Sequence, residues 1–291
     1  MQLIISADDY GLSEGITINI LNAFDHGALS STSMIANGRA FDHAMDEYKK
    51  RSGLRLSIHL NFIEGSPVLP AEQVPLLVDD SGNFCHTFLS LWRQYLTSNR
   101  QYCHALKDQI QQEMTAQILK IAQCFDSTFQ INIDSHLHLH MVPFVFDALL
   151  ELHNQFSFSY VRLPQERLFL VEGRTESLKT YCSLSPVKNR LLNVLSKMYQ
   201  AQLSARHIAH SHYFVGILFS GKMTESVVRS ALSRINPAEA GKITEILFHP
   251  GQALESEKGL RVKHYSPWRQ REYEAVKSES FQNFVRTLQS N

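Results

Sequence analysis

The stretch Leu3-Ile4-Ile5-Ser6-Ala7-Asp8-Asp9-Tyr10-Gly11 places two adjacent carboxylates directly after a short apolar run. A second stretch has the same design, because Ile131-Asn132-Ile133 leads into Asp134-Ser135-His136-Leu137-His138-Leu139-His140. Short apolar runs predict buried strands, and α/β sheets and barrels carry active sites at the carboxyl ends of their strands. Adjacent carboxylates and alternating imidazoles bind divalent metals and transfer protons. The two stretches together predict a metal-dependent hydrolase.

Outward from these stretches, strand patterns alternate with helical patterns along the chain. We expect strands at residues 3–6, 31–36, 54–60, 131–134, 160–163, 208–214 and 243–248. Helices are expected at residues 13–26, 41–51, 106–125, 142–153, 187–203, 227–235 and 273–288. Repeated strand-then-helix order predicts a parallel sheet. About seven strands favour a single-domain irregular (β/α) barrel, TIM-barrel-like, over residues 1–291. Residues 61–84 are rich in proline and predict a long loop, which is typical of a lid.

Composition narrows the classes of partner. The 291 residues include 28 Lys+Arg and 28 Asp+Glu, so the formal net charge is zero and nothing indicates nucleic acid or an anionic membrane. No apolar run approaches the roughly 18 residues of a spanning helix. The first motif begins by residue 8 and leaves no room for a signal peptide, so we expect a cytoplasmic location.

Charged or imidazole groups follow most of the predicted strands, and a parallel barrel brings such strand ends to one face. Each has a structural alternative: an Asx turn or helix cap for the aspartates, an exposed loop for the histidine run, and a core or capping role for the other histidines. On an extended segment alternate residues share a face, so two or three histidines of the run could meet one ion. The groups in question are Asp8, Asp9, His59, His136, Arg162 and His249.

In this order, the motifs resemble those of the YdjC-like carbohydrate deacetylases, a family that includes chitooligosaccharide deacetylase and hopanoid-associated relatives. Ser6, Tyr10 and Ser57 depart from the Asn, Phe and Gly usual in the family, and none of them is a predicted ligand. The matching segments span nearly the whole chain: residues 6–13, 27–33, 57–61 with 64–67, 134–140, 161–164 and 245–251.

The resemblance implies an irregular (β/α) barrel related to the polysaccharide deacetylases, and a possible homodimer. The implied reaction removes the N-acetyl group from an amino sugar or oligosaccharide. The implied roles are Asp9, His59 and His136 as metal ligands, Asp8 as general base and His249 as general acid. We expect His138, His140 and Arg162 to contact the substrate or support the site, with Arg162 orienting the substrate or Asp8.

One carboxylate and two imidazoles suit zinc, cobalt, nickel or iron better than magnesium, although the resemblance keeps magnesium open. We therefore expect one divalent ion, magnesium or zinc, with other transition metals possible. Two alternatives remain open: another metallohydrolase that cleaves phosphoester or non-sugar amide bonds, and a non-enzymatic sugar- or metal-binding relative. Acetate release from N-acetylglucosamine oligomers distinguishes among the three.

Overall fold

The computed structural model describes residues 2–171, 175–235, 241–255, 257 and 259–290. Strand β1 (Gln2–Tyr10) lies inside an eight-stranded sheet of order β6-β5-β4-β3-β2-β1-β8-β7, in which every neighbouring pair is parallel. The other strands are β2 (Ser31–Met34), β3 (Arg55–Leu60), β4 (Asn132–Ser135), β5 (Tyr160–Val161), β6 (Ala209–His210), β7 (Tyr213–Val215) and β8 (Ile243–Phe248).

The irregularity of the barrel lies in β6 and β7. These two strands follow each other in the chain, yet β6 pairs with β5 and β7 pairs with β8 at the opposite edge of the sheet. Ser211, between them, hydrogen-bonds both backbone groups of Leu163 through its hydroxyl, at 2.9 and 2.8 Å. One continuous segment thus supplies both edge strands of the sheet, β6 at one edge and β7 at the other. The predicted α/β barrel is confirmed, but within the described residues it has eight strands rather than seven, since the strand expected at 208–214 is divided.

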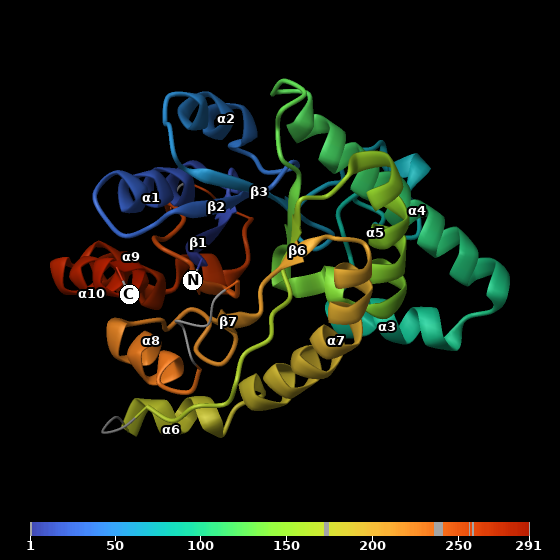
Figure 1. The fold of residues 1–291 in the computed structure, drawn as a ribbon. Helices are drawn as coiled ribbons and strands as arrows, with labels where there is room; N and C mark the ends of the chain where they lie inside the picture. Colours follow the sequence, from blue (N-terminus) through green and yellow to red (C-terminus); the bar gives the residue numbers. More distant parts are fainter. Residues whose placement is uncertain (1, 172–174, 236–240, 256, 258, 291) are drawn as a thin grey trace.

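Helices surround the sheet, as Figure 1 shows. Ser13 caps α1 as expected, because its hydroxyl accepts a hydrogen bond from the Ile16 backbone. The α-helices are α1 (Glu14–Asp25), α2 (Phe41–Lys49), α3 (Phe88–Thr97), α4 (Arg100–Ala122), α5 (Pro143–Phe156), α6 (Thr175–Tyr181), α7 (Ser185–Ala205), α8 (Glu225–Leu232), α9 (Pro267–Lys277) and α10 (Glu279–Ser290). Short 3-10 helices are η1 (Ala71–Gln73), η2 (His136–Met141) and η3 (Val262–Tyr265).

The C-terminal helix predicted at 273–288 is two helices. The chain is extended at Ser278 (φ −62°, ψ 138°), between α9 and α10. The sequence pattern also missed α3, which follows the predicted long loop. That loop itself contains η1 and one isolated antiparallel bridge between Val78 and Phe84.

Burial on both faces explains the apolar character of the central strands. Every residue of β8 and all but the first of β1 are buried. Parallel strands covered on both sides have nearly continuous apolar sequences, so a polar residue within or directly after such a run is easily recognised in the sequence. Within the described residues, no helix combines the length and the apolar character needed to cross a bilayer.

Candidate active site

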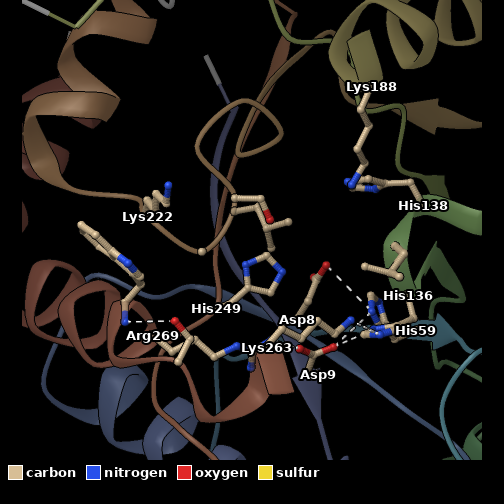
Figure 2. Close-up of a pocket in the computed structure, with 16 residues that line it drawn as sticks. Asp8, Asp9, His59, His136, His138, Lys188, Lys222, His249, Lys263 and Arg269 are labelled. Carbon is tan, nitrogen blue, oxygen red and sulfur yellow. Dashed lines mark hydrogen bonds and ion pairs between the residues drawn. The ribbon is translucent and has the colours of Figure 1, made fainter. Parts of the chain in front are cut away.

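The carboxyl ends of β1, β3, β4 and β8 converge on a pocket with a cavity of about 250 Å³ (Figure 2). Parallel register brings them together, since His59 of β3 is level with Asp134 of β4, and Ala7 of β1 is level with Phe248 of β8. The pocket is lined by all five residues predicted to bind metal or transfer protons, which are Asp8, Asp9, His59, His136 and His249.

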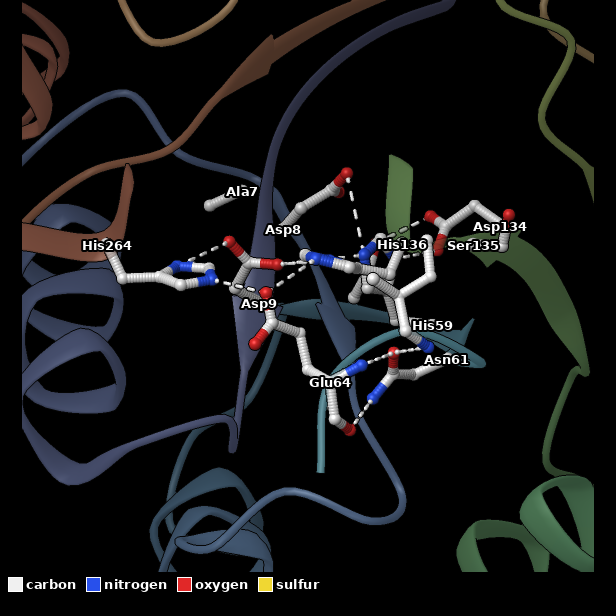
Figure 3. Close-up of polar contacts among 12 residues, drawn as sticks. Ala7, Asp8, Asp9, His59, Asn61, Glu64, Asp134, Ser135, His136 and His264 are labelled. Carbon is white, nitrogen blue, oxygen red and sulfur yellow. Dashed lines mark hydrogen bonds and ion pairs between the residues drawn. The ribbon is translucent and has the colours of Figure 1, made fainter. Parts of the chain in front are cut away.

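The backbone of Asp9 is left-handed, with φ 73°. The ladder between β1 and β2 shifts register between Ala7 and Tyr10, so the strand is irregular at this point. Asp9 Oδ1 lies 2.8 Å from His136 Nδ1 and 3.8 Å from His59 Nε2 (Figure 3). The two carboxylates do not point to opposite sides, as expected for a regular strand, because Asp8 Oδ2 lies 3.9 Å from the same His59 Nε2.

The donor atoms of these three residues fit a divalent cation. His59 Nε2 is buried and has no hydrogen-bond partner among the described residues, and the buried Asp9 Oδ1 lies 2.8 Å from His136 Nδ1. His59 Nδ1 donates to Asp134 Oδ1 at 2.6 Å, which leaves its Nε2 lone pair facing both Asp8 and Asp9, at 3.9 and 3.8 Å. A carboxylate behind a histidine in this way is the usual support of a metal-binding imidazole. A buried unpaired polar atom costs about 1–3 kcal/mol, and a bound cation would remove that cost.

The electrostatic field of the cluster also favours positive charge. Burial alone would lower the pKa of His59, but the carboxylates of Asp8 and Asp134 outweigh it and raise that pKa. Burial alone would raise the pKa of Asp9, but the charges of His136 and Arg269 hold it well below its usual range. The site therefore keeps Asp9 ionised.

Arg162 joins the base candidate Asp8 to a buried charge cluster. Its Nη1 and Nη2 donate to the two oxygens of Asp8 at 2.8 and 2.9 Å. Nη2 also lies 2.9 Å from Asp134 and 2.7 Å from Glu245. Although burial opposes the charge, these carboxylates raise the pKa of Arg162 well above its usual value. Only 1% of Arg162 is exposed and it does not line the pocket, so it is placed to orient Asp8 and not to touch a substrate.

The three alternating histidines do not share a face, contrary to the expectation for an extended run. They lie in η2, where Leu137 and His138 have left-handed φ values of 54° and 58°. His136 therefore faces Asp9, whereas His138 lines the pocket and meets the ring of Phe214 at 5.7 Å between ring centres. His140 donates from Nε2 to the Arg162 carbonyl at 2.9 Å, so it braces the strand end. Burial lowers the pKa of His140 to about 4.

His249 directly follows β8 and keeps 15% of its side chain exposed. Burial, assisted by the nearby charge of Arg269, lowers the pKa of His249 to about 3, so the ring is neutral at pH 7. Glu272 of α9 accepts a hydrogen bond from the His249 backbone at 2.5 Å and lies 3.8 Å from its ring Nδ1.

Sequence reasoning missed the residues that reach the site from the C-terminal segment and from the start of the long loop. Arg269 donates from Nη2 to Asp9 at 2.6 Å, and Lys263 donates to His136 Nε2 at 2.8 Å. Glu64, expected in a loop that could form a lid, is only 5% exposed and lies 3.2 Å from His264. Arg269 and Glu272 are polar residues on the buried side of α9, which is the one signal that could have found them.

Two other groups of side chains have ligand-type spacing, namely Glu64 with His136 and His264, and Asp8 with His59 and Asp134. Both already contain cationic partners. Arg261 and Lys263 lie 3.4 and 3.7 Å from Glu64, and Arg162 pairs with both aspartates of the other group. The group of Asp9, His59 and His136 has cationic partners too, since Arg269 donates to Asp9 and Lys263 donates to His136. We prefer it because the buried His59 Nε2 has no hydrogen-bond partner among the described residues, and because it is the ligand set that the family resemblance implies.

The pocket is more cationic than the neutral chain suggests. Lys188 of α7 and Lys222 lie on opposite sides of it (Figure 2), and Lys263 and Arg269 line it as well. Burial lowers the pKa of Lys263 to about 8, although Asp9 and Glu64 oppose that change. The chain has a formal net charge of zero, but the residues that line this pocket include more basic than acidic side chains.

Comparison with known proteins gives relatives in bacteria. Over 195 residues the chain is 28% identical to a carbohydrate deacetylase of Clostridium beijerinckii, covering 66% of this chain and 74% of that protein. It is 30% identical over 181 residues to the chitooligosaccharide deacetylase of Serratia marcescens, covering 62% of this chain and 65% of that protein. A carbohydrate deacetylase of Listeria monocytogenes is 36% identical over 121 residues, covering 42% of this chain and 46% of that protein. The chain thus spans less than two thirds of the last two relatives.

A solved structure from Enterococcus faecalis, of a proposed cellobiose-phosphate cleavage protein, matches with a TM-score of 0.69. The match covers 99% of this chain and 94% of that one at 20% identity, so it concerns the fold alone. The family model for YdjC-like proteins matches residues 2–287, which confirms the resemblance seen in the sequence. The chain therefore belongs to the YdjC-like protein family.

Proposed function

We propose that the protein removes the N-acetyl group from an amino sugar or oligosaccharide with the help of one divalent metal ion. The observation that carries the proposal is the buried group of Asp9, His59 and His136, which has ligand-type spacing, contains the unpaired His59 Nε2, and lines one pocket with Asp8 and His249. The names of the relatives, carbohydrate deacetylase and chitooligosaccharide deacetylase, support the reaction and the class of substrate.

Asp9, His59 and His136 would hold the ion, and magnesium, zinc or another transition metal is compatible with this donor set. When bound, such an ion polarises an amide carbonyl and lowers the pKa of water. Asp134 keeps His59 in the tautomer that offers Nε2, and Arg269 anchors the second oxygen of Asp9.

The chain's own residues supply the proton transfers. Asp8 is the proposed base, and Arg162 fixes both of its oxygens while free lone pairs remain to accept a proton from water. His249 is the proposed acid. Because its pKa is about 3, it is neutral at pH 7, and the proton it gives to the departing amine must reach it during turnover. General acids and bases each contribute about 10²–10⁴-fold to the rate.

A test of the proposal measures acetate release from a panel of N-acetylated sugars, using metal-free protein reloaded with single ions. We expect equal amounts of acetate and free amine, and only after reloading. His136→Ala should release none under the same conditions. Equal activity in metal-free protein would reject the metal site, and hydrolysis of phosphoesters without acetate release would favour the rival metallohydrolase.

We also propose a homodimer, supported by an apolar face of α7. Val187, Val194 and Met198 are 65%, 52% and 55% exposed, and their spacing places them on one side of the helix. Leu184, which caps the start of α7, is 81% exposed. Exposed apolar stripes of this kind mark contact surfaces. Light scattering should give twice the chain mass of 33.2 kDa, and Val187→Glu with Met198→Glu should give the monomer.

A further inference from the structure

A loop between β7 and α8, residues 216–223, forms one wall of the pocket through Ser220, Gly221 and Lys222. Two buried carboxylates hold this wall, one near each end. Near the first end, Glu166 accepts hydrogen bonds from the backbone of Gly216 and of Leu218, both at 2.7 Å. Glu166 is 1% exposed, and among the described residues the hydrogen bonds of its carboxylate go to Asn189 and to the backbone of the wall, not to His249.

Near the other end of the wall, Glu272 of α9 likewise accepts a backbone hydrogen bond from the wall, and it also binds the backbone of His249. Its Oε1 accepts a hydrogen bond from the Met223 backbone at 2.7 Å, while Oε2 accepts the His249 backbone at 2.5 Å. Glu272 has no exposed surface. One carboxylate thus joins the pocket wall to the turn that carries the proposed proton donor.

The side chain of His249 also faces this carboxylate. Its Nδ1 is buried, has no hydrogen-bond partner among the described residues, and lies 3.8 Å from Glu272 Oε2. A carboxylate at that position favours the tautomer with its proton on Nδ1, since the partner of one ring nitrogen decides the state of the other. Nε2 then carries the lone pair that receives a proton and passes it on. The other charges near the ring are Arg269 and Lys263, which oppose protonation, and Asp8 and Asp9, which favour it.

We propose that Glu272 is a positioning residue for His249: it fixes the backbone of that residue, selects the Nδ1–H tautomer, and links both to the pocket wall. The catalytic meaning of this inference rests on the deacetylase function proposed above. The structural part does not, because the tautomer of His249 can be measured without substrate.

The first test uses the ring ¹⁵N resonances of histidine, with those of His249 identified by their loss in His249→Ala. Burial raises the pKa of Glu272 to about 7 against the hydrogen bonds of the Met223 and His249 backbones, so spectra are recorded at about pH 8.5, where the carboxylate is ionised. We expect mainly Nδ1–H in the native protein and a shift toward Nε2–H in Glu272→Gln. Glu166→Gln is the matched control, since it removes a buried carboxylate from the same wall, and it should leave the tautomer unchanged.

The second test uses kinetics. Glu272→Gln should lower kcat for an N-acetylated sugar by at least about 10-fold at similar KM, which is part of the roughly 10²–10⁴-fold that acid catalysis contributes, because the His249 ring itself remains. It should act much less on 4-nitrophenyl acetate, whose leaving group needs no proton. Glu166→Gln should change KM more than kcat. Glu272→Asp, which keeps the charge, should restore part of the Nδ1–H population of His249 and part of kcat. If Glu272→Gln does not fold, Glu272→Asp is compared with the native protein in its place.

An unchanged His249 tautomer in Glu272→Gln, or an equal change in Glu166→Gln, would overturn the inference. Equal losses with the amide and the activated ester would overturn it as well, because proton donation would then not be the affected step. If the native protein releases no acetate from any sugar, the proposed function fails, while the tautomer result still decides the positioning role.

Discussion

Arg162→Met tests whether the buried charge cluster holds the base candidate in place. The guanidinium is 1% exposed and lies 2.7–2.9 Å from the carboxylates of Asp8, Asp134 and Glu245. Methionine fills a similar volume but carries no charge, so the substitution leaves three buried carboxylates without their shared cation.

The magnitude follows from burial. Removing one partner of a buried ion pair costs about 3–5 kcal/mol, because the remaining charge is left uncompensated. Here one cation serves three carboxylates, so we expect the free energy of unfolding to fall by at least that amount at pH 7. Asp8 also loses its orientation, and we expect kcat to fall by about 10²–10⁴-fold, the usual contribution of a general base.

The pH dependence has a definite sign. Burial alone would raise the pKa of Asp134, but Arg162 and His59 lower it below its usual 3.8. In the native protein the stability from Asp134 is therefore present above that value and is lost only as the pH falls through the lowered pKa. In Arg162→Met the cation is gone and burial raises the pKa, so the folded variant takes up protons at a higher pH. The stability deficit should therefore shrink from about pH 7 to about pH 5.

Urea unfolding followed by circular dichroism measures the deficit, with Arg51→Met as the matched control. Arg51 also pairs with two carboxylates, at 2.9 Å from Asp25 and 3.0 Å from Glu47, but its side chain is 21% exposed. Surface pairs are worth about 0–1 kcal/mol, so the control should lose no more than that. A deficit below about 1 kcal/mol in Arg162→Met, or one that is the same at both pH values, would refute the reasoning.

Three further predictions concern the proposed metal site and its proton-transfer residues. His136→Ala should lose bound metal in elemental analysis while keeping its circular dichroism spectrum, because the residue supplies a ligand and little of the core; retained stoichiometric metal would contradict this. Asp8→Asn and His249→Ala should keep the metal and lose kcat, because each removes one proton-transfer group; full activity in either variant would show that the substituted residue is structural. Asp134→Asn should weaken metal binding by about 10–100-fold in a chelator competition assay, because His59 loses the carboxylate that fixes its tautomer; unchanged affinity would rule out that support.

The grouping of the site residues was predictable because it depends on local patterns and one rule of topology. Apolar runs mark buried strands, and in a parallel barrel the polar residues that follow them meet on one face. Asp9, His59 and His136 come together for that reason, and the predicted bounds of β8 agree with the structure. The resemblance to the YdjC-like family added roles that spacing alone could not assign.

Other features were decided by contacts between distant parts of the chain. The segment at 208–214 has the pattern of one strand, and only the pairing of its two halves with different strands, β5 and β8, divides it. The left-handed backbone at Asp9 and at His138 directs their side chains, and hydrophobic periodicity carries no signal for such conformations.

The sequence by itself determined the fold class, the strand ends that form the site and the candidate ligands, because burial on both faces of a parallel sheet is written in local apolar runs. Only the tertiary structure decided how the charges are compensated. Arg269 contacts Asp9 across 260 positions, and Arg162 contacts Asp8 across 154. No sequence periodicity extends over such separations. The pairing of Asp9 with Arg269 and of Asp8 with Arg162 is therefore seen only in the folded barrel, where the end of β1 lies near α9 and near the residue that follows β5.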